Sequence, residues 1–268
     1  MTERPADLPD YHAPPIDEVA ISVQFPPIDR FFDTHAGLFW RRVRDAYPRS
    51  ESQPRLEGPI ESADPGPIVP VQLQLTPGQG RVWLISEDDD FLIQIQNTRF
   101  IQNWRRRQSQ YVHFEQIRDL FWEHYREFLS FLTEENLDGP VVQQVEISYI
   151  NWIPDMAMSE FLRPASVAEI SVPGLDKHPD QQSWIARYSL RNDETLIQRL
   201  FVQCLPATRV SDPTVSGSQL GLIFRAARQD GIDTSKLAEL IDAARIIIVT
   251  AFTDLTTGAA HQRWEKFQ

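Results

Sequence analysis

Hydrophobic and polar positions alternate along several short segments of the chain. The segment 17–25 places its larger hydrophobic residues at every second position: Val19, Ile21, Val23 and Phe25. Alternation of this kind indicates a strand with one buried face. Similar patterns predict strands at about 68–75, 81–86, 91–96 and 141–153, and later at about 165–172, 184–191, 195–204 and 219–229.

Hydrophobic residues spaced three and four positions apart predict three main helices, at about 34–47, 113–137 and 234–256. Thr34 is expected to cap the first helix, and Asp233 or Thr234 the last. Residues 49–67 and 206–219 are polar and contain several prolines, so they are expected to be long loops.

This order of elements predicts an α+β fold, with antiparallel sheets in two halves packed against the three helices. Residues 1–15 are expected to form an extended N-terminal arm, 16–153 an N-terminal α+β half, and 154–268 a strand-rich half that ends in a long helix. The segments "VAISV" (19–23) and "VEISY" (145–149) share a pattern and each opens one half. An internal repeat is therefore one interpretation, and five positions do not decide it.

The stretch "DDDFLIQIQNTRFIQNWRRRQ" (88–108) is predicted to be a hairpin that turns at Asn97-Thr98. Its returning strand ends in Trp104 and the arginines Arg105, Arg106 and Arg107, which is a pattern that can stack bases and neutralise phosphates. The pairing also places the acidic run 88–90 near these arginines, so an ion-pair network at the hairpin end is the favoured interpretation. Three adjacent aspartates point in alternate directions, which disfavours a metal site there.

The composition excludes several classes of function. The 268 residues carry a formal net charge of −12, which disfavours nonspecific binding of nucleic acid. A single cysteine, Cys204, excludes an internal disulfide, and its hydrophobic neighbours indicate a buried inert thiol. No apolar run is long enough to span a membrane and no signal segment is evident, so a cytoplasmic location is expected.

No common catalytic motif is present. The six histidines do not occur at metal-binding spacings, and His124 is interpreted as a surface or boundary residue. The chain lacks the glycine-rich patterns of nucleotide-binding enzymes and the serine motif of common hydrolases. Catalytic residues, metal and cofactor are therefore all predicted as none.

A binding surface is suggested instead by polar and aromatic residues in the predicted strands. Gln94, Gln96, Asn103 and Trp152 are expected on sheet faces or strand ends, where amides and aromatic rings can line a groove for a small ligand or a peptide. The solvent face of an ordinary sheet has the same appearance.

Four segments resemble a sporadically distributed family of bacterial proteins of about this length: "LPDYHAPPIDEVAISVQF", "HAGLFWRRVRDAYPRSESQP", "LIQIQNTRFIQNWRR" and "AARIIIVTAFTDLTTGAAHQRW". The resemblance covers nearly the whole chain, and the hairpin segment is its most specific part. It implies one integral unit, and it carries over no catalytic residue. A patchy distribution is typical of accessory, mobile-element or defence-linked genes.

We therefore expect a non-catalytic protein that recognises a protein partner or a small ligand. A homodimer through the C-terminal helix is one hypothesis, because Ile246, Val249 and Ala251 widen its apolar surface. The alternatives are nucleic-acid binding through Trp104–Arg107 and a hydrolase with a site assembled from loops.

Overall fold

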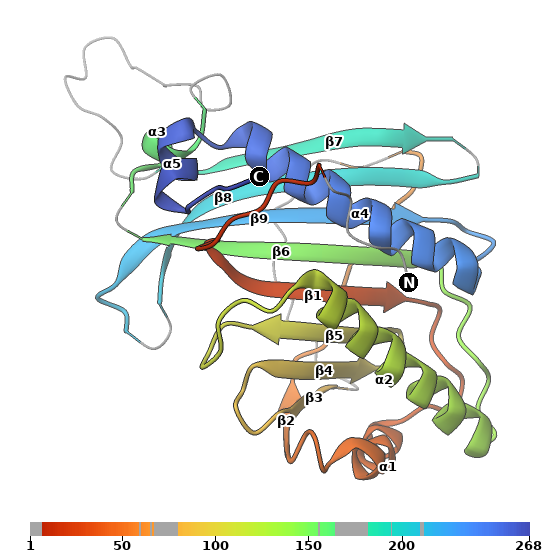
Figure 1. The fold of residues 1–268 in the computed structure, drawn as a ribbon. Coiled ribbons are helices and arrows are strands. Elements are labelled where there is room, and N and C mark those ends of the chain that lie inside the picture. Colours follow the sequence, from red (N-terminus) through yellow and green to blue (C-terminus); the bar gives the residue numbers. More distant parts are fainter. Residues whose placement is uncertain are drawn as a thin grey trace.

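Nine antiparallel strands form one continuous sheet in the computed structural model (Figure 1). The model describes residues 7–58, 60–64, 66, 80–154, 156–163, 182–193, 195–209 and 212–268. The strands are β1 (Ile16–Gln24), β2 (Arg49–Gln53), β3 (Arg81–Ile85), β4 (Phe91–Gln96), β5 (Arg99–Arg105), β6 (Gln144–Pro154), β7 (Trp184–Asn192), β8 (Ile197–Thr208) and β9 (Ser216–Ala227). Their spatial order is β2-β3-β4-β5-β1-β6-β9-β8-β7. The predicted α+β class is confirmed.

The described helices lie between and after the strands. They are α1 (Asp33–Val43), α2 (Phe114–Glu134), α3 (Met158–Phe161), α4 (Thr234–Leu255) and α5 (Gly258–Arg263). Figure 1 shows the two long helices, α2 and α4, crossing the same face of the sheet. Two ion pairs join them, Arg118 with Asp242 at 2.9 Å and Glu115 with Arg245.

The hydrophobic core fills the space between this face and the helices. Every second residue of the central strand β1 is fully buried there, beginning with Val19 and Ile21. Aromatic rings from three elements meet edge to face or stacked, with the Phe128 centroid 5.6 Å from that of Phe39 and 5.2 Å from that of Phe100. The alternation and the helical stripes in the sequence thus converge on one core.

The opposite face of the sheet, which we call the polar face, carries charged and amide side chains. Successive side chains of a strand point to opposite faces, so the residues that alternate with the core positions lie here. They include Glu18 and Gln24 of β1, Gln94 and Gln96 of β4, Asn103 and Arg105 of β5, Glu146 and Trp152 of β6, and Arg199 and Arg225 of β8 and β9. The described residues of the segment 54–64 pack on part of this face through Glu61, which pairs with Arg199 and, at 3.0 Å, with Arg225.

Several predicted boundaries are wrong. Residues 49–53 form the edge strand β2, not part of a loop, and their exposed polar side chains give no alternation that could have revealed it. Both ends of the predicted loop 206–219 are strand, since β8 continues to Thr208 and β9 begins at Ser216. Long twisted strands extend beyond the sheet core, where both of their faces can be polar.

The first helix also differs from its prediction. It ends at Val43, and Thr34 lies inside it. The N-terminus is instead capped by His35, whose ring nitrogen Nδ1 accepts a hydrogen bond from the Phe32 backbone N–H. The last helix is capped by Asp233 as predicted, with the Asp233 carboxylate accepting from the Lys236 N–H at 2.9 Å. The predicted strands 68–75 and 165–172 lie outside the described residues.

Candidate functional site

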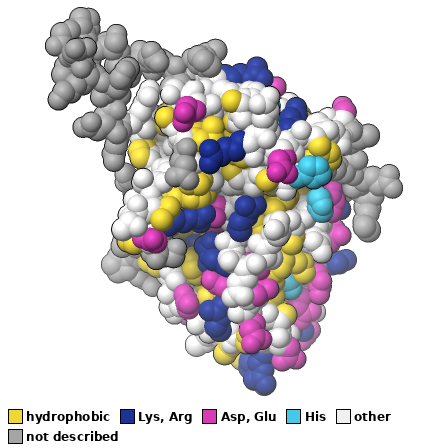
Figure 2. All heavy atoms as spheres, turned by 60° about the vertical axis from the view of Figure 1, so that its left-hand side comes forward, with side chains coloured by type: hydrophobic (Ala, Val, Ile, Leu, Met, Phe, Trp, Pro, Cys, Tyr) yellow, Lys and Arg dark blue, Asp and Glu magenta, His cyan; other side chains and the backbone are white. Residues whose placement is uncertain are grey.

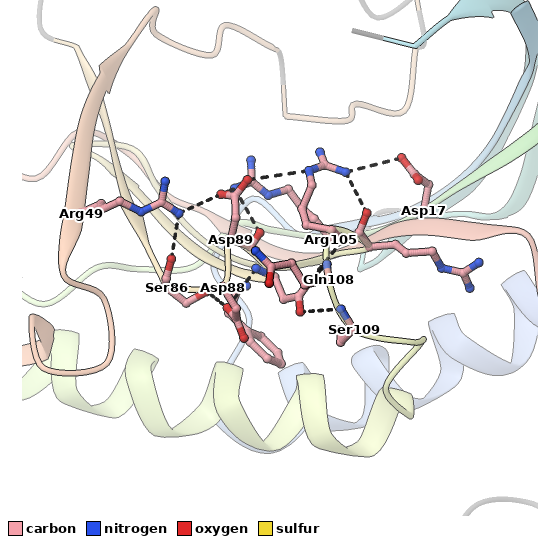
Figure 3. Close-up of polar contacts among 12 residues, drawn as sticks. Asp17, Arg49, Ser86, Asp88, Asp89, Arg105, Gln108 and Ser109 are labelled. Carbon is pink, nitrogen blue, oxygen red and sulfur yellow. Dashed lines mark hydrogen bonds and ion pairs between the residues drawn. The ribbon is translucent and has the colours of Figure 1, made fainter. Parts of the chain in front are cut away.

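The end of the β4–β5 hairpin is organised around the carboxylate of Asp90. Both of its oxygens accept backbone N–H bonds, from Arg107, Gln108 and Ser109, each at 2.9 Å (Figure 3). Burial alone would raise the pKa of Asp90, but these donors outweigh it and lower the pKa. The acidic run therefore holds the chain in place where it leaves β5.

The three arginines are engaged by the protein itself. Arg105 is buried, bonds Asp89 at 2.6 Å, and lies with its guanidinium 5.3 Å from the centre of the Trp83 ring. Arg106 donates to the Pro14 carbonyl at 2.9 Å, and Arg107 lies 3.9 Å from carboxylate oxygens of both Asp17 and Asp89. The ion-pair network predicted at the hairpin end is present.

This arrangement leaves few groups for nucleic acid at the hairpin end. Trp104 is fully buried, so its ring cannot stack on a base while the hairpin is folded. On the face shown in Figure 2, basic and acidic side chains are interspersed, with hydrophobic groups between them. The arginines serve here mainly as partners of carboxylates and carbonyls.

Two of the predicted amide residues belong to one hydrogen-bond ladder across the polar face. Trp83 Nε1 donates to Gln94 Oε1 at 3.0 Å, and Gln94 Nε2 donates to Asn103 Oδ1 at 2.8 Å. The Asn103 amide in turn donates to Glu18, whose pKa is raised because burial outweighs that bond. Four adjacent strands are thereby connected through side chains.

The other predicted residues lie apart from this ladder. Gln96 pairs with both backbone groups of Leu56, at 3.0 and 3.1 Å, and so attaches the segment 54–64 to the sheet. Trp152 lies on β6, in the second half of the sheet, beneath the Arg209 guanidinium at 4.7 Å. The structure thus does not bring the predicted residues into a single pocket lined by described residues.

A different site lies under the N-terminal arm. The described part of the arm, residues 7–15, pairs with the C-terminal tail: the His12 N–H donates to the Glu265 carbonyl and the Ala13 N–H to the Trp264 carbonyl, each at 3.1 Å. The Tyr11 ring is buried against α4, and its hydroxyl lies 2.8 Å from that of Thr253. The arm and tail therefore form a cover over the C-terminal part of α4.

Beneath this cover is a small chamber of about 50 Å³. Its walls are mainly apolar and come from the arm, α4 and the central strands; they include Leu8, Ile16, Leu222, Ile248 and Phe252. Its polar lining residues include Tyr111, Tyr149, Asn151 and Arg245. The volume exceeds that of one water molecule and suits a small chemical group.

Two phenol hydroxyls belong to this chamber. Tyr149 is 3% exposed, and its hydroxyl interacts with that of Tyr111 but forms no well-aligned hydrogen bond within the described part of the chain. Burial raises its pKa well above the ordinary value, and the neighbouring Tyr111 hydroxyl adds to the rise. Burial also raises the pKa of Tyr111 to about 12, so both groups are neutral donors near neutral pH.

The chamber continues into an open cleft of about 590 Å³. The two share Asp10, Tyr11, Pro14, Tyr111 and His113, and the cleft adds further polar residues that include His12, Arg106, Gln108 and Ser109. We call the chamber and the open cleft together the arm cleft. It combines a mostly apolar inner end with a polar entrance, as small-ligand sites commonly do.

Sequence reasoning missed this site because its parts are distant in the chain. Tyr149 occupies an inward position of β6, so the alternation marks it as core, which is correct. The only signal was chemical: a tyrosine at a core position needs a partner for its hydroxyl. Asn151, which the same alternation places beside it, lines the chamber as well.

Three further features would each indicate another kind of function: a metal-binding cluster, a reactive thiol and a membrane-spanning helix. Among the described residues, no group of three His, Cys, Asp or Glu side chains is placed to hold a metal ion. Cys204 is buried as predicted, and burial raises the pKa of its thiol to about 12. No helix in the described ranges is long and apolar enough to cross a bilayer.

In comparisons with known proteins, no family model, no curated protein and no solved structure matches this chain.

Proposed function

We propose that this protein is a non-catalytic binding protein that holds a small ligand in the arm cleft. The observation that carries the proposal is the buried Tyr149 hydroxyl, which lines a cavity without a well-aligned hydrogen bond. Its contact with the Tyr111 hydroxyl is poorly aligned, and a bound acceptor in better geometry would stabilise the buried group.

The chamber favours a ligand whose small end accepts hydrogen bonds. Tyr111 and Tyr149 are neutral donors, and Arg245 adds a guanidinium beside them. Apolar walls surround these donors, so a carbonyl or ether group on a compact hydrocarbon fits the chamber better than a fully hydrated group. The rest of the ligand would lie in the polar cleft outside.

Extraction of bound small molecules from the purified protein, followed by mass spectrometry, tests this proposal. The Val249→Phe variant would place a ring beside the chamber, since Val249 lines it on α4. Ile246→Phe is the matched control, because Ile246 is 41% exposed on the same helix. We expect a compound to co-purify with the wild type and the control and to be lost from Val249→Phe. Equal recovery from all three proteins would contradict the proposal.

A homodimer through the C-terminal helix stays a second part of the proposal. Ile246 is exposed and supports it, whereas Val249 lines the chamber and Ala251 packs against the core. Light scattering that finds a monomer at micromolar concentration would count against the dimer. We also retain the cytoplasmic location as a proposal.

We further propose that the sheet consists of two related halves. In each, an opening strand pairs with the last strand of a meander, β1 with β5 and β6 with β9, and a long helix follows. The opening strands pair with each other in a symmetric register, with Ile21 opposite Ile147, Val19 opposite Tyr149 and Val23 opposite Val145. The segments "VAISV" and "VEISY" therefore face each other across a pseudo-twofold axis, as an internal repeat requires.

A further inference from the structure

His124 is a boundary residue: it is buried against the core and also borders an open cleft, so of the two interpretations from the sequence the surface one is wrong. It lies on α2, is 7% exposed, and packs edge to face against Tyr47 with centroids 5.1 Å apart. The signal was available in the sequence, since His124 follows Phe121 by three residues and precedes Phe128 by four. Its imidazole also lines an open cleft of about 730 Å³.

Hydrogen bonding fixes the tautomer of this imidazole. The Gln102 amide nitrogen lies 3.2 Å from the Asn103 carbonyl and 3.4 Å from the Leu92 carbonyl, and these acceptors orient the amide. The Gln102 oxygen Oε1 therefore faces His124 Nδ1, at 2.8 Å, and can only accept. Nδ1 must carry the proton in the neutral ring, so Nε2 has a lone pair.

Nε2 makes no hydrogen bond with any residue that the structure describes. It lies on the side of the ring away from Gln102, in a side chain that lines the cleft. Burial lowers the pKa of His124, which keeps the lone pair available near neutral pH. The His124 imidazole is held in place by the hydrogen bond from Nδ1 to the Gln102 side-chain carbonyl oxygen. Its other nitrogen, Nε2, can therefore accept a hydrogen bond from a ligand.

The residues around this cleft are acidic. Its lining includes Asp45, Glu87, Asp88 and Glu123, and no lysine or arginine among the described residues. None of the four forms an ion pair in the described part of the chain, whereas Asp17 and Asp89 at the nearby hairpin end do. Phe91 and Tyr47 add aromatic surface to the walls. Such a cleft concentrates cations.

We propose that the cleft around His124 binds a primary ammonium group, with one N–H donated to His124 Nε2 and the charge met by Glu123 and Asp88. The site is separate from the arm cleft, with which it shares only Gln108 as a lining residue. The Ser86 hydroxyl at its rim already donates to Asp88 at 2.5 Å and accepts from the Phe91 N–H (Figure 3), so no serine nucleophile faces His124. The site is one for binding.

Calorimetric titration of the full chain with putrescine tests the proposal, together with the side-chain nitrogen resonances of the histidines. His124→Asn is the informative variant, because its amide nitrogen replaces Nδ1 as the donor to Gln102 while Nε2 is lost. Glu123→Gln removes one charge at the cleft. Glu135→Gln removes the same charge from the exposed end of α2 and is the matched control.

We expect saturable binding with a shift of the His124 Nε2 resonance. Loss of a hydrogen bond to a charged donor predicts weakening of about tenfold in His124→Asn, and Glu123→Gln should also weaken binding. Glu135→Gln should leave the affinity unchanged. Equal weakening in the control would indicate nonspecific charge attraction and overturn the site, as would the absence of saturation at millimolar putrescine.

Two further titrations identify the ligand class. A polyamine and a lysine side chain both present a primary ammonium, so Nα-acetyl-lysine methylamide is titrated in parallel with putrescine. The probe that binds with the lower Kd indicates whether the natural ligand is a polyamine or a lysine side chain. A titration with Zn²⁺ alone tests the competing possibility of a metal site. Tight Zn²⁺ binding that His124→Asn abolishes, without binding of either amine, would replace the proposal with a metal site.

Discussion

Two buried polar groups in this molecule differ in how well their hydrogen-bonding capacity is satisfied. The Asp90 carboxylate, 1% exposed, has three backbone donors, whereas the Tyr149 hydroxyl, 3% exposed, has no well-aligned partner. A satisfied buried charge stabilises its neighbourhood, and an unsatisfied hydroxyl destabilises it. Substitutions at these two positions should therefore have effects of opposite sign.

Asp90→Ala should lower the free energy of unfolding by about 3 kcal/mol, because three backbone N–H groups lose a charged acceptor. Glu87→Ala, at an exposed position in the same turn, should change it by less than about 0.5 kcal/mol. Urea denaturation at neutral pH measures both. Comparable losses in the two variants would show that the Asp90 bonds are not what stabilises the hairpin end.

The contribution of Asp90 should depend on pH in a defined direction. Its pKa is lowered in the folded state, so the stabilisation is fully present above its ordinary value of 3.8 and is lost as pH falls through the folded pKa. The difference in unfolding free energy between wild type and Asp90→Asn should therefore narrow below pH 3.8. A difference that stays constant across that range would contradict the assignment.

Tyr149→Phe, in the absence of ligand, should leave stability unchanged or raise it by up to about 1 kcal/mol, since it removes a buried hydroxyl that lacks a well-aligned bond. Tyr11→Phe should lower stability by about 1 kcal/mol, because the Tyr11 hydroxyl contacts that of Thr253. Thermal unfolding of the two variants measures the contrast. A clear loss in Tyr149→Phe would mean that the contact between the Tyr149 and Tyr111 hydroxyls stabilises the fold.

At the scale of elements, the segment 54–64 is attached to the polar face by a buried charge cluster. Glu61 is 8% exposed and pairs with Arg199, which is fully buried, and with Arg225, which also bonds Glu146 at 2.6 Å. Burying ions is unfavourable unless each has its partner. The segment and the strands beneath it are thus mutually dependent.

Glu61→Gln should lower the free energy of unfolding by about 3 kcal/mol or more, because the buried Arg199 guanidinium loses its carboxylate. Glu57→Gln is the control, since the Glu57 side chain, which pairs with Arg55 in the same segment, is 40% exposed. Chemical denaturation compares them, and hydrogen exchange at 56–62 reports the attachment directly. Unchanged exchange in Glu61→Gln would show that other contacts, such as Gln96 with Leu56, suffice.

Across the whole molecule, the pairing of β1 with β6 forms the centre of the sheet. β1 and β6 pair along most of their length, and the ion pairs between α2 and α4 cross the same boundary. Separation at residue 140 would expose the edges of both central strands. Unpaired central edges favour aggregation over folding.

The fragment 1–139 expressed alone should therefore lack a cooperative unfolding transition, and co-expression with 140–268 should restore it. Near-ultraviolet circular dichroism and amide resonance dispersion distinguish the two outcomes. A folded, monomeric fragment would instead show that the halves are separable domains.

Much of the fold follows from local pattern. Strands with one buried face and helices with a wide apolar stripe were predicted within a few residues, because burial imposes periods of two and 3.6. The edge strand β2 escaped prediction because its burial is nearly uniform and low. The ends of β8 and β9 escaped because Pro206 and Gly217 occupy regular strand positions there.

By itself, the sequence determined the α+β class, the hairpin at 88–108 and the inert cysteine, since each depends on residues close together in the chain. Only the tertiary structure decided that nine strands form one sheet, that the arm covers a chamber beside Tyr149, and that His124 faces an acidic cleft. Those features join residues that are far apart in the chain. Their contacts depend on strand order and helix placement, which no local pattern encodes.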